Sequence, residues 1–128
     1  MDYIRKIIKS KRGNAIIETT IMFMILIMLT VGYMYFTQLV RESTVLQVAA
    51  RESARAYAVT GDYSFAYNKA INELKLGGID PNRAKINIYT KGNERVARIQ
   101  LNKRLIIPFA GEYRITIGGG ADFKKEFQ

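Results

Sequence analysis

The longest hydrophobic pattern in the chain is a run of 22 uncharged residues from Thr19 to Val40. At a rise of 1.5 Å per residue, a helix of that length is about 33 Å long and can cross a hydrocarbon core of about 30 Å. The run is longer than the apolar region of a cleaved secretory signal, and no small-x-small cleavage site follows it. Tyr33, Tyr35 and Phe36 near its end suit a membrane–water interface. The pattern therefore predicts a transmembrane helix.

A helical period continues beyond this run. Small and apolar residues recur at spacings of seven, four, three and four and trace one stripe along a helix: Leu39, Leu46, Ala50, Ser53 and Tyr57. Ala49 and Ala54 widen the stripe, and Gly61 is a stop signal. We therefore expect one helix of about 45 residues from near Asn14 to Val59, apolar all round in its first half and amphipathic in its second.

A second, shorter helix is indicated after this stop signal. Asp62 or Ser64 can cap its first turn, and the pair Gly77-Gly78 would end it after Leu76. Its spacing of apolar residues predicts packing through one face. That face is expected to hold Phe65, Ala70, Ile71 and Leu74.

The hydrophobic period changes from 3.6 to 2 after Pro81, which indicates strands. Apolar and polar residues alternate in three segments: Ile86 and Ile88; Ala97, Ile99 and Leu101; Tyr113, Ile115 and Ile117. The sequence Lys91-Gly92-Asn93-Glu94 has the composition of a hairpin turn, and Pro108 and Gly111 mark a second break. Residues 105–107 form either a short strand or a hydrophobic loop. The pattern therefore predicts a meander of three or four antiparallel strands.

An antiparallel meander has one apolar face that must be covered. The amphipathic half of the long helix can cover it, with the second helix alongside. The sequence therefore predicts an α+β fold, in which a long N-terminal helix packs on a small antiparallel β-sheet together with a second short helix. We expect a basic cytoplasmic leader over residues 1–13, the transmembrane half of the long helix over 14–37, and an extracytoplasmic α+β head over 38–128.

The net charge of +9 is unevenly distributed along the chain. Five Lys and Arg residues against Asp2 give +4 over residues 1–13, and residues 14–128 carry the remaining +5. Because positive flanks stay on the cytoplasmic side, we expect a single-pass protein of the cytoplasmic membrane, with its N-terminus inside and its head outside. The positive charge of the head forms a solvated surface or meets acidic partners such as anionic cell-wall polymers or DNA.

Composition and spacing indicate no catalytic or ligand site. The chain has neither Cys nor His, which removes disulfides, Cys-ligated metals and the commonest general base. Gly118-Gly119-Gly120 lacks the strand-to-helix context of a phosphate loop and is interpreted as a bend at a strand end. The scattered carboxylates form no metal or acid–base set: Glu73, Asp80, Glu94, Glu112 and Asp122. We expect no enzyme activity, cofactor, metal or small-molecule substrate, and nucleic acid is not an expected partner.

The segment from Lys11 to Glu18 carries the most informative chemistry. Gly13 has no side chain to block a peptidase, and Lys11 and Arg12 would hold the following bond at the anionic cytoplasmic face. A cut after Gly13 would make Asn14 the new N-terminus and Glu18 the fifth mature residue. An unpaired carboxylate is costly in a membrane, whereas pairing with the new amine of a neighbouring subunit would fix the offset between two helices. The segment therefore predicts cleavage and subunit docking.

These residues resemble the type IV prepilin class, whose signature is a basic leader, a glycine, four residues and a glutamate before an apolar helix. From Lys11 to Gly61 the chain is more closely similar to the TadE-like minor pilins or pseudopilins of tight-adherence systems. Two segments carry the resemblance: Arg12, Gly13, Ala15 and Glu18 at the start, and Ala49, Ala50, Arg51, Glu52, Ala54 and Arg55 at the end of the helix. The strand-rich half resembles that family only in outline.

The resemblance implies a pilin-like fold and a non-enzymatic role in pilus assembly, secretion or cell adhesion. The implied partners are the membrane, other pilin-like subunits, an assembly platform, and a prepilin peptidase that cuts between Gly13 and Asn14. The implied location is the cytoplasmic membrane or, after assembly, an extracellular pilus or secretion fibre. Two positions depart from the family pattern. Asn14 replaces the common phenylalanine, and Thr19 follows Glu18 where an aromatic residue is usual.

Other interpretations are open. Gly13 and Glu18 can be ordinary flanks of a signal anchor, with Glu18 extended to the interface. The protein can also be an uncleaved, single-pass accessory protein, or a competence-type pseudopilin whose basic head contacts DNA. Arg51, Glu52 and Arg55 can be plain surface charges that support the helix by a few tenths of a kcal/mol at most.

Overall fold

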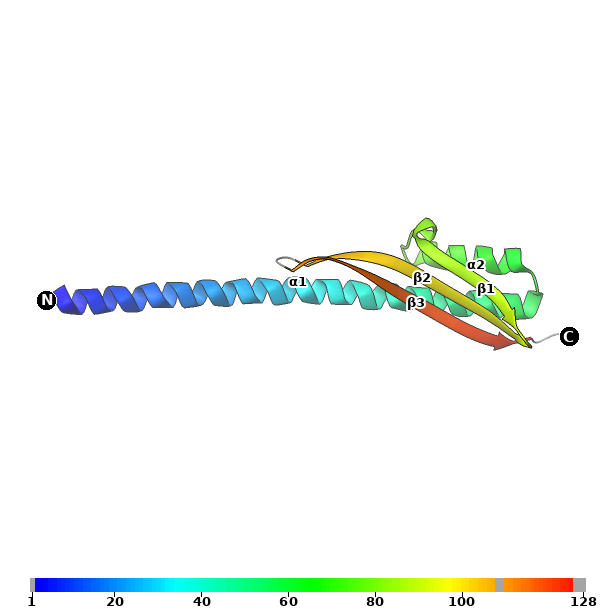
Figure 1. Cartoon of the computed structure of the whole chain (residues 1–128), viewed down its shortest axis with the longest axis horizontal. Helices are drawn as coiled ribbons and strands as arrows, with labels where there is room; N and C mark the ends of the chain where they lie inside the picture. The colour runs from blue at the N-terminus through cyan, green and yellow to red at the C-terminus, as the bar shows by residue number, and fades with distance from the viewer. Residues whose placement is uncertain (1, 108–109, 126–128) are drawn as a thin grey trace. The chain divides into compact units, whose positions relative to one another are not determined.

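The computed structural model describes residues 2–107 and 110–125, with side chains from residue 13 onward. In chain order, its elements are α1 (Asp2–Thr60), α2 (Tyr63–Leu76), the short 3₁₀ helix η1 (Pro81–Arg83), β1 (Ala84–Lys91), β2 (Glu94–Ile107) and β3 (Gly111–Lys124). Figure 1 shows the three strands as one curved sheet beside the second half of α1. This arrangement confirms the predicted α+β layout, with a sheet of three antiparallel strands in the order β1-β2-β3.

Contacts within the fold divide the chain into two units, residues 1–36 and residues 37–128. The first unit is formed by α1 alone. The second holds the remainder of α1, both short helices and the sheet. Every apolar side chain that is buried, among those described, belongs to this second unit, so it is the part of the chain with a hydrophobic core.

The structure confirms the predicted end of α1 but not its predicted start. The helix begins at Asp2, so the predicted start near Asn14 is too late. Lys, Arg and Ile all tolerate helical backbone, and the single Gly13 does not interrupt it. At the other end, Gly61 adopts a φ of 69° and its N–H donates to the Tyr57 carbonyl at 2.9 Å. This left-handed glycine ends the helix where the sequence indicates.

Helix α2 is held by the predicted cap. The carboxylate of Asp62 accepts a hydrogen bond from the Ser64 N–H at 2.8 Å, which satisfies a donor in the first turn. Its buried face consists of Ala66, Ala70 and Leu74. The assignment of Phe65 to that face is wrong, because its side chain is 51 % exposed. Phe65 lies one residue away from the four-residue spacing of the buried positions and therefore about 100° around the helix.

The strands differ in how much of their length is paired. β1 pairs with residues 94–101 of β2, whereas β2 pairs with β3 along its whole length. Residues 102–107 of β2 therefore pair only with residues 111–116 of β3. This two-stranded extension is called the ribbon below. It includes residues 105–107, which form strand rather than loop because they continue the β2–β3 ladder.

The core lies between the sheet and the two helices. One buried cluster joins α1, α2 and the strands: Leu46, Ala49, Ala50, Ala70, Leu74, Ile79, Ile99 and Leu101. A second cluster lies closer to the end of α1: Ala54, Ala66, Ile88 and Ala97. The predicted stripe of α1 is confirmed at Leu46, Ala50 and Ser53, which are fully buried. Because alanine is so frequent on the buried faces, the helices can approach the sheet closely.

Gly119 marks the closest approach between α1 and the sheet. A Cβ at this position would lie 2.5 Å from the Gln47 nitrogen and 2.6 Å from the Leu46 carbonyl oxygen. Next to it, the Gln47 side-chain amide donates to the Gly120 carbonyl at 3.1 Å. The interpretation of residues 118–120 as a bend at a strand end is wrong, because these glycines lie inside β3. Their function in the fold is to let the backbone of a helix rest on a strand.

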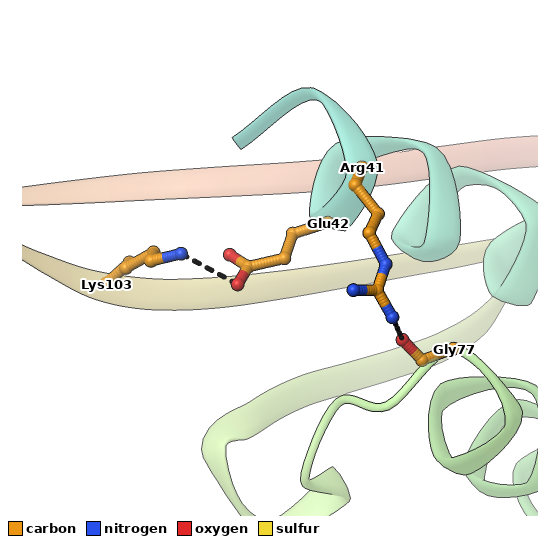
Figure 2. A network of polar contacts seen from close by, with 4 residues as sticks. All are labelled: Arg41, Glu42, Gly77 and Lys103. Atoms are coloured by element: carbon orange, nitrogen blue, oxygen red, sulfur yellow. Dashed lines mark hydrogen bonds and ion pairs between the residues drawn. The ribbon is translucent and has the colours of Figure 1, made fainter. Parts of the chain in front are cut away.

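Two polar contacts hold the start of the amphipathic half of α1 in the second unit (Figure 2). The Lys103 ammonium donates to the Glu42 carboxylate at 2.7 Å, with side-chain exposures of 15 % and 25 %. The Arg41 guanidinium donates to the Gly77 carbonyl at 3.3 Å, at the end of α2. The first contact ties α1 to the ribbon, and the second ties α1 to α2.

We expect the Glu42–Lys103 pair to contribute measurable coupling because both groups are largely buried. Glu42→Ala and Lys103→Ala should each lower the free energy of unfolding by about 1–2 kcal/mol, since each leaves a partly buried charge unpaired. A double-mutant cycle, measured by urea denaturation in detergent, should return a coupling of about 1 kcal/mol. The more exposed Lys69–Glu73 pair, at 3.4 Å on α2, should couple by only a few tenths. Equal coupling in the two cycles would contradict this expectation.

Candidate functional site

The segment predicted to be processed lies on α1 within the first unit. Gly13 is partly exposed, and the five residues from Asn14 to Glu18 are exposed. None of the residues in the most apolar window of this stretch is buried by the described protein, and by length and composition α1 can cross a membrane. Large side chains such as Met22 and Phe23 are more than 60 % exposed. A surface this apolar requires lipid or other helices around it.

Three threonine hydroxyls in this stretch are satisfied by the helix itself. Thr19 donates to the Ala15 carbonyl, Thr20 to the Ile16 carbonyl and Thr30 to the Leu26 carbonyl, each at 2.8 Å. Each bond spans four residues and needs neither water nor a second helix. The threonines after Glu18 therefore do not weaken the assignment of α1 as a membrane helix.

Glu18 differs from these threonines. Its carboxylate has no hydrogen bond or ion pair with any residue whose side chain the structure describes. The neighbours one turn away on the same face, Asn14 and Met22, are uncharged, so they supply no counter-ion. Within the described side chains, the charge is thus exposed and available to a group from another molecule.

The bond expected to be cut lies in helical backbone. Gly13 and Asn14 both belong to α1, and a Cβ built on Gly13 meets no atom within 4 Å. A side chain at Gly13 would therefore leave the fold undisturbed and would act only on a molecule that approaches the bond. The backbone of Lys11 and Arg12 is also helical, but the side chains expected to be recognised lie outside those described.

The second family-like segment has a clear structural basis in the second unit. Ala49, Ala50 and Ala54 are fully buried, two in the first core cluster and one in the second. Arg51 and Arg55 are exposed, and Glu52 is partly exposed. The alanines provide the small surface on which the sheet rests, while the charged residues between them face away from the core.

Sequence reasoning missed a basic cleft beside the start of β1, where the ribbon begins. This open cleft of about 660 Å³ is lined by Arg83 of η1, Lys103 and Arg104 of β2, and Arg114 of β3, together with three uncharged residues. Its four cations come from three separate elements, so no local charge motif marks them. The only sequence signal is the net charge of +5 over residues 14–128.

A comparison with known families finds a match, which lies within the first half of the chain. Residues 13–55 match the family model described as TadE-like protein. The match begins at Gly13 and ends at Arg55, so it contains both segments on which the resemblance rests, apart from Arg12, and it confirms that resemblance. No curated protein and no solved structure matches the chain. The family match and the apolar helix together fit a membrane pilin-like protein.

Proposed function

We propose that this TadE-like chain is a non-enzymatic minor pilin or pseudopilin of a tight-adherence or type IV pilus-like assembly. The observation that carries the proposal is the exposed Glu18 at the start of an apolar helix, inside the part of the chain that matches the family. The subunit is held in the cytoplasmic membrane, is cut after Gly13, and packs against other pilin-like subunits through α1.

The proposed organisation assigns one task to each region. Residues 1–13 form the cytoplasmic leader, in which Lys11 and Arg12 are read by a prepilin peptidase. Residues 14–37 span the membrane, and residues 38–128 form the head on the outer side. Support for this orientation comes from the five basic residues of the leader, because positive flanks stay on the cytoplasmic side.

Cleavage and docking are linked by charge. Hydrolysis of the Gly13–Asn14 bond gives Asn14 a positive amine, four residues before a carboxylate that has no partner among the described side chains. In a bilayer, Glu18 is destabilised unless a cation meets it. The Asn14 amine of an adjacent subunit supplies that cation, and the strong attraction at low dielectric selects one axial offset between neighbouring helices.

The cleavage site is tested by the mass of the mature protein. In cells that contain a prepilin peptidase, the wild-type chain should begin at Asn14, whereas Gly13→Val should retain the leader, because the new side chain blocks access to the bond. Gly32→Val is the matched control: this glycine is also in α1 with no atom within 4 Å of a Cβ, and its variant should be cut normally. An uncut wild-type chain would instead support the uncleaved accessory protein.

A further inference from the structure

The ribbon is the two-stranded part of the sheet, because β1 does not extend along it. Residues 102–107 have β3 on one side and no strand on the other, because β1 begins opposite Leu101. In Figure 1, β2 and β3 continue well past the start of β1. Within the described residues, the edge of β2 is therefore unpaired along the ribbon, and the face that carries Asn102, Arg104 and Ile106 is exposed.

Contacts in the second unit show the direction in which the ribbon runs. The sheet rests on Ala54 in the second core cluster, on Leu46 at Gly119, and on Glu42 at Lys103. From the body of the sheet to the ribbon, these contacts move toward lower residue numbers in α1. The ribbon thus extends to the side of this unit at which the uncharged run joins it.

Connectivity places the Lys103–Glu42 pair close to a membrane surface. Glu42 follows the last residue of the uncharged run, Val40, by two positions, or about 3 Å along a helix. If α1 crosses a bilayer through that run, Glu42 lies at the surface, and so does Lys103, which is bound to it (Figure 2). Ile106 is three residues further along β2, within about 10 Å.

The end of the ribbon has exposed apolar side chains on both faces. Ile106 is 63 % exposed and Tyr113 is 52 % exposed, and they lie on opposite faces because Tyr113 pairs with Leu105. Leu105 and Ile107 are partly buried, and neither described core cluster includes any of these four residues. An apolar end with an aromatic ring is typical of segments that enter a membrane interface.

Directly behind this apolar end is the basic cleft. Arg104 and Arg114 lie directly opposite each other on the same face of the two strands. Two like charges in this position repel each other and destabilise the pairing. Glu112 lies 3.5 Å from Arg104, but within the described residues neither Arg83 nor Arg114 takes part in an ion pair. A phosphate-bearing partner between these cations would relieve the repulsion.

We propose that the ribbon is a membrane-contact element. Its apolar end, Leu105–Ile107 with Tyr113, enters the headgroup region of a bilayer, and Arg83, Arg104 and Arg114 bind lipid phosphates. The partner is a lipid surface, because the apolar tip of the ribbon is followed by cations, as a bilayer has acyl chains followed by anionic phosphates. The proposal rests on the proposed membrane anchoring of α1 and is independent of cleavage or assembly.

A single-tryptophan experiment on the full chain tests this contact. The protein has no Trp, so Tyr113→Trp creates one probe at the ribbon, and Tyr89→Trp creates a control at another exposed position of the sheet. Both variants are reconstituted in vesicles that contain phosphatidylglycerol and lipids with brominated acyl chains. We expect blue-shifted emission and strong quenching for Tyr113→Trp and neither for Tyr89→Trp. Equal, weak quenching of both would overturn the proposal.

The role of the cations has its own variant. In the Tyr113→Trp background, Arg104→Gln with Arg114→Gln should cause a several-fold loss of quenching in vesicles with phosphatidylglycerol, and a smaller loss in purely zwitterionic vesicles. In the Tyr113→Trp protein with both arginines intact, soluble polyphosphate should abolish the quenching, which would also support binding of phosphate by these cations. A blue shift that grows with protein density and shows no bromine quenching would assign the ribbon to a second copy of the chain and overturn the lipid contact. Flotation of the vesicles reports insertion of α1 separately.

Discussion

Gly119→Ala is expected to lower the free energy of unfolding of the head by about 3 kcal/mol or more, which is the upper end for overpacking in a core. The added Cβ would lie 2.5 Å from the Gln47 nitrogen and 2.6 Å from the Leu46 carbonyl oxygen. These are main-chain atoms of α1 and cannot rotate away as a side chain can. The helix must therefore move off the sheet, and the packing of Leu46 is lost with it. For a domain of this size, each kcal/mol corresponds to about 4–8 °C in Tm.

Gly120→Ala is the matched control for this substitution. A Cβ at Gly120 would have the Arg98 Cγ at 3.7 Å and the Ala97 carbonyl oxygen at 3.8 Å, which are ordinary contacts. Its backbone carbonyl would still accept from Gln47. Thermal denaturation in detergent, followed by the near-ultraviolet circular dichroism of tyrosine, should show a change within about 0.5 kcal/mol. Similar losses in the two variants would show that the close approach at Gly119 is unimportant.

Glu18→Gln is expected to remove the subunit from assembled fibres while leaving it in the membrane. In the proposed assembly, the substitution leaves the Asn14 amine of the adjacent subunit without its counter-ion in low dielectric. Breaking one side of such a buried pair costs about 3–5 kcal/mol, or more than a hundredfold in association. The measurement is the ratio of the protein in sheared fibres to that in the membrane fraction.

Asp122→Asn provides the control for loss of a carboxylate. Asp122 is exposed on β3, in the second unit, and its replacement should leave incorporation unchanged. Glu18→Asp keeps the charge on a shorter side chain and should retain part of the incorporation. Normal incorporation of Glu18→Gln would refute the docking role of this residue, whatever the result of the cleavage experiment.

The sequence predicts the fold wherever one buried face of a helix or strand produces a hydrophobic periodicity. The apolar stripe of α1 and the alternation of apolar and polar residues around Ile99 predict the core, because the helix and the strand pack their apolar faces against each other. The prediction for Phe65 is wrong because the small Ala66, which has a weaker hydrophobic signal, takes the buried position at the start of α2. Gly119 could not be assigned, since a glycine has no hydrophobic signal and its requirement comes from a helix 72 residues earlier in the chain.

The two candidate sites also differ in how far the sequence predicts them. The Gly13–Glu18 spacing is local, so the sequence alone suffices to propose it, and the family match covers it. The basic cleft depends on the register between β2 and β3, which brings Arg104 opposite Arg114. It also depends on η1, which contributes Arg83. These relations arise from long-range pairing, and neither charge spacing nor hydrophobic period reports them.

The contact between α1 and β3 also sets an order of events during synthesis. The alanine face of α1 is complete at Ala58, but the glycine on which the helix rests is residue 119. The hydrogen bond between Gln47 and Gly120 closes a loop of 73 residues. During that interval, the part of α1 around Leu46 and Gln47 lacks its contact with the sheet backbone, which only the last strand supplies. A chain that stops before β3 therefore lacks the close approach at Gly119 and the hydrogen bond at Gly120, so the final strand completes the packing of the head.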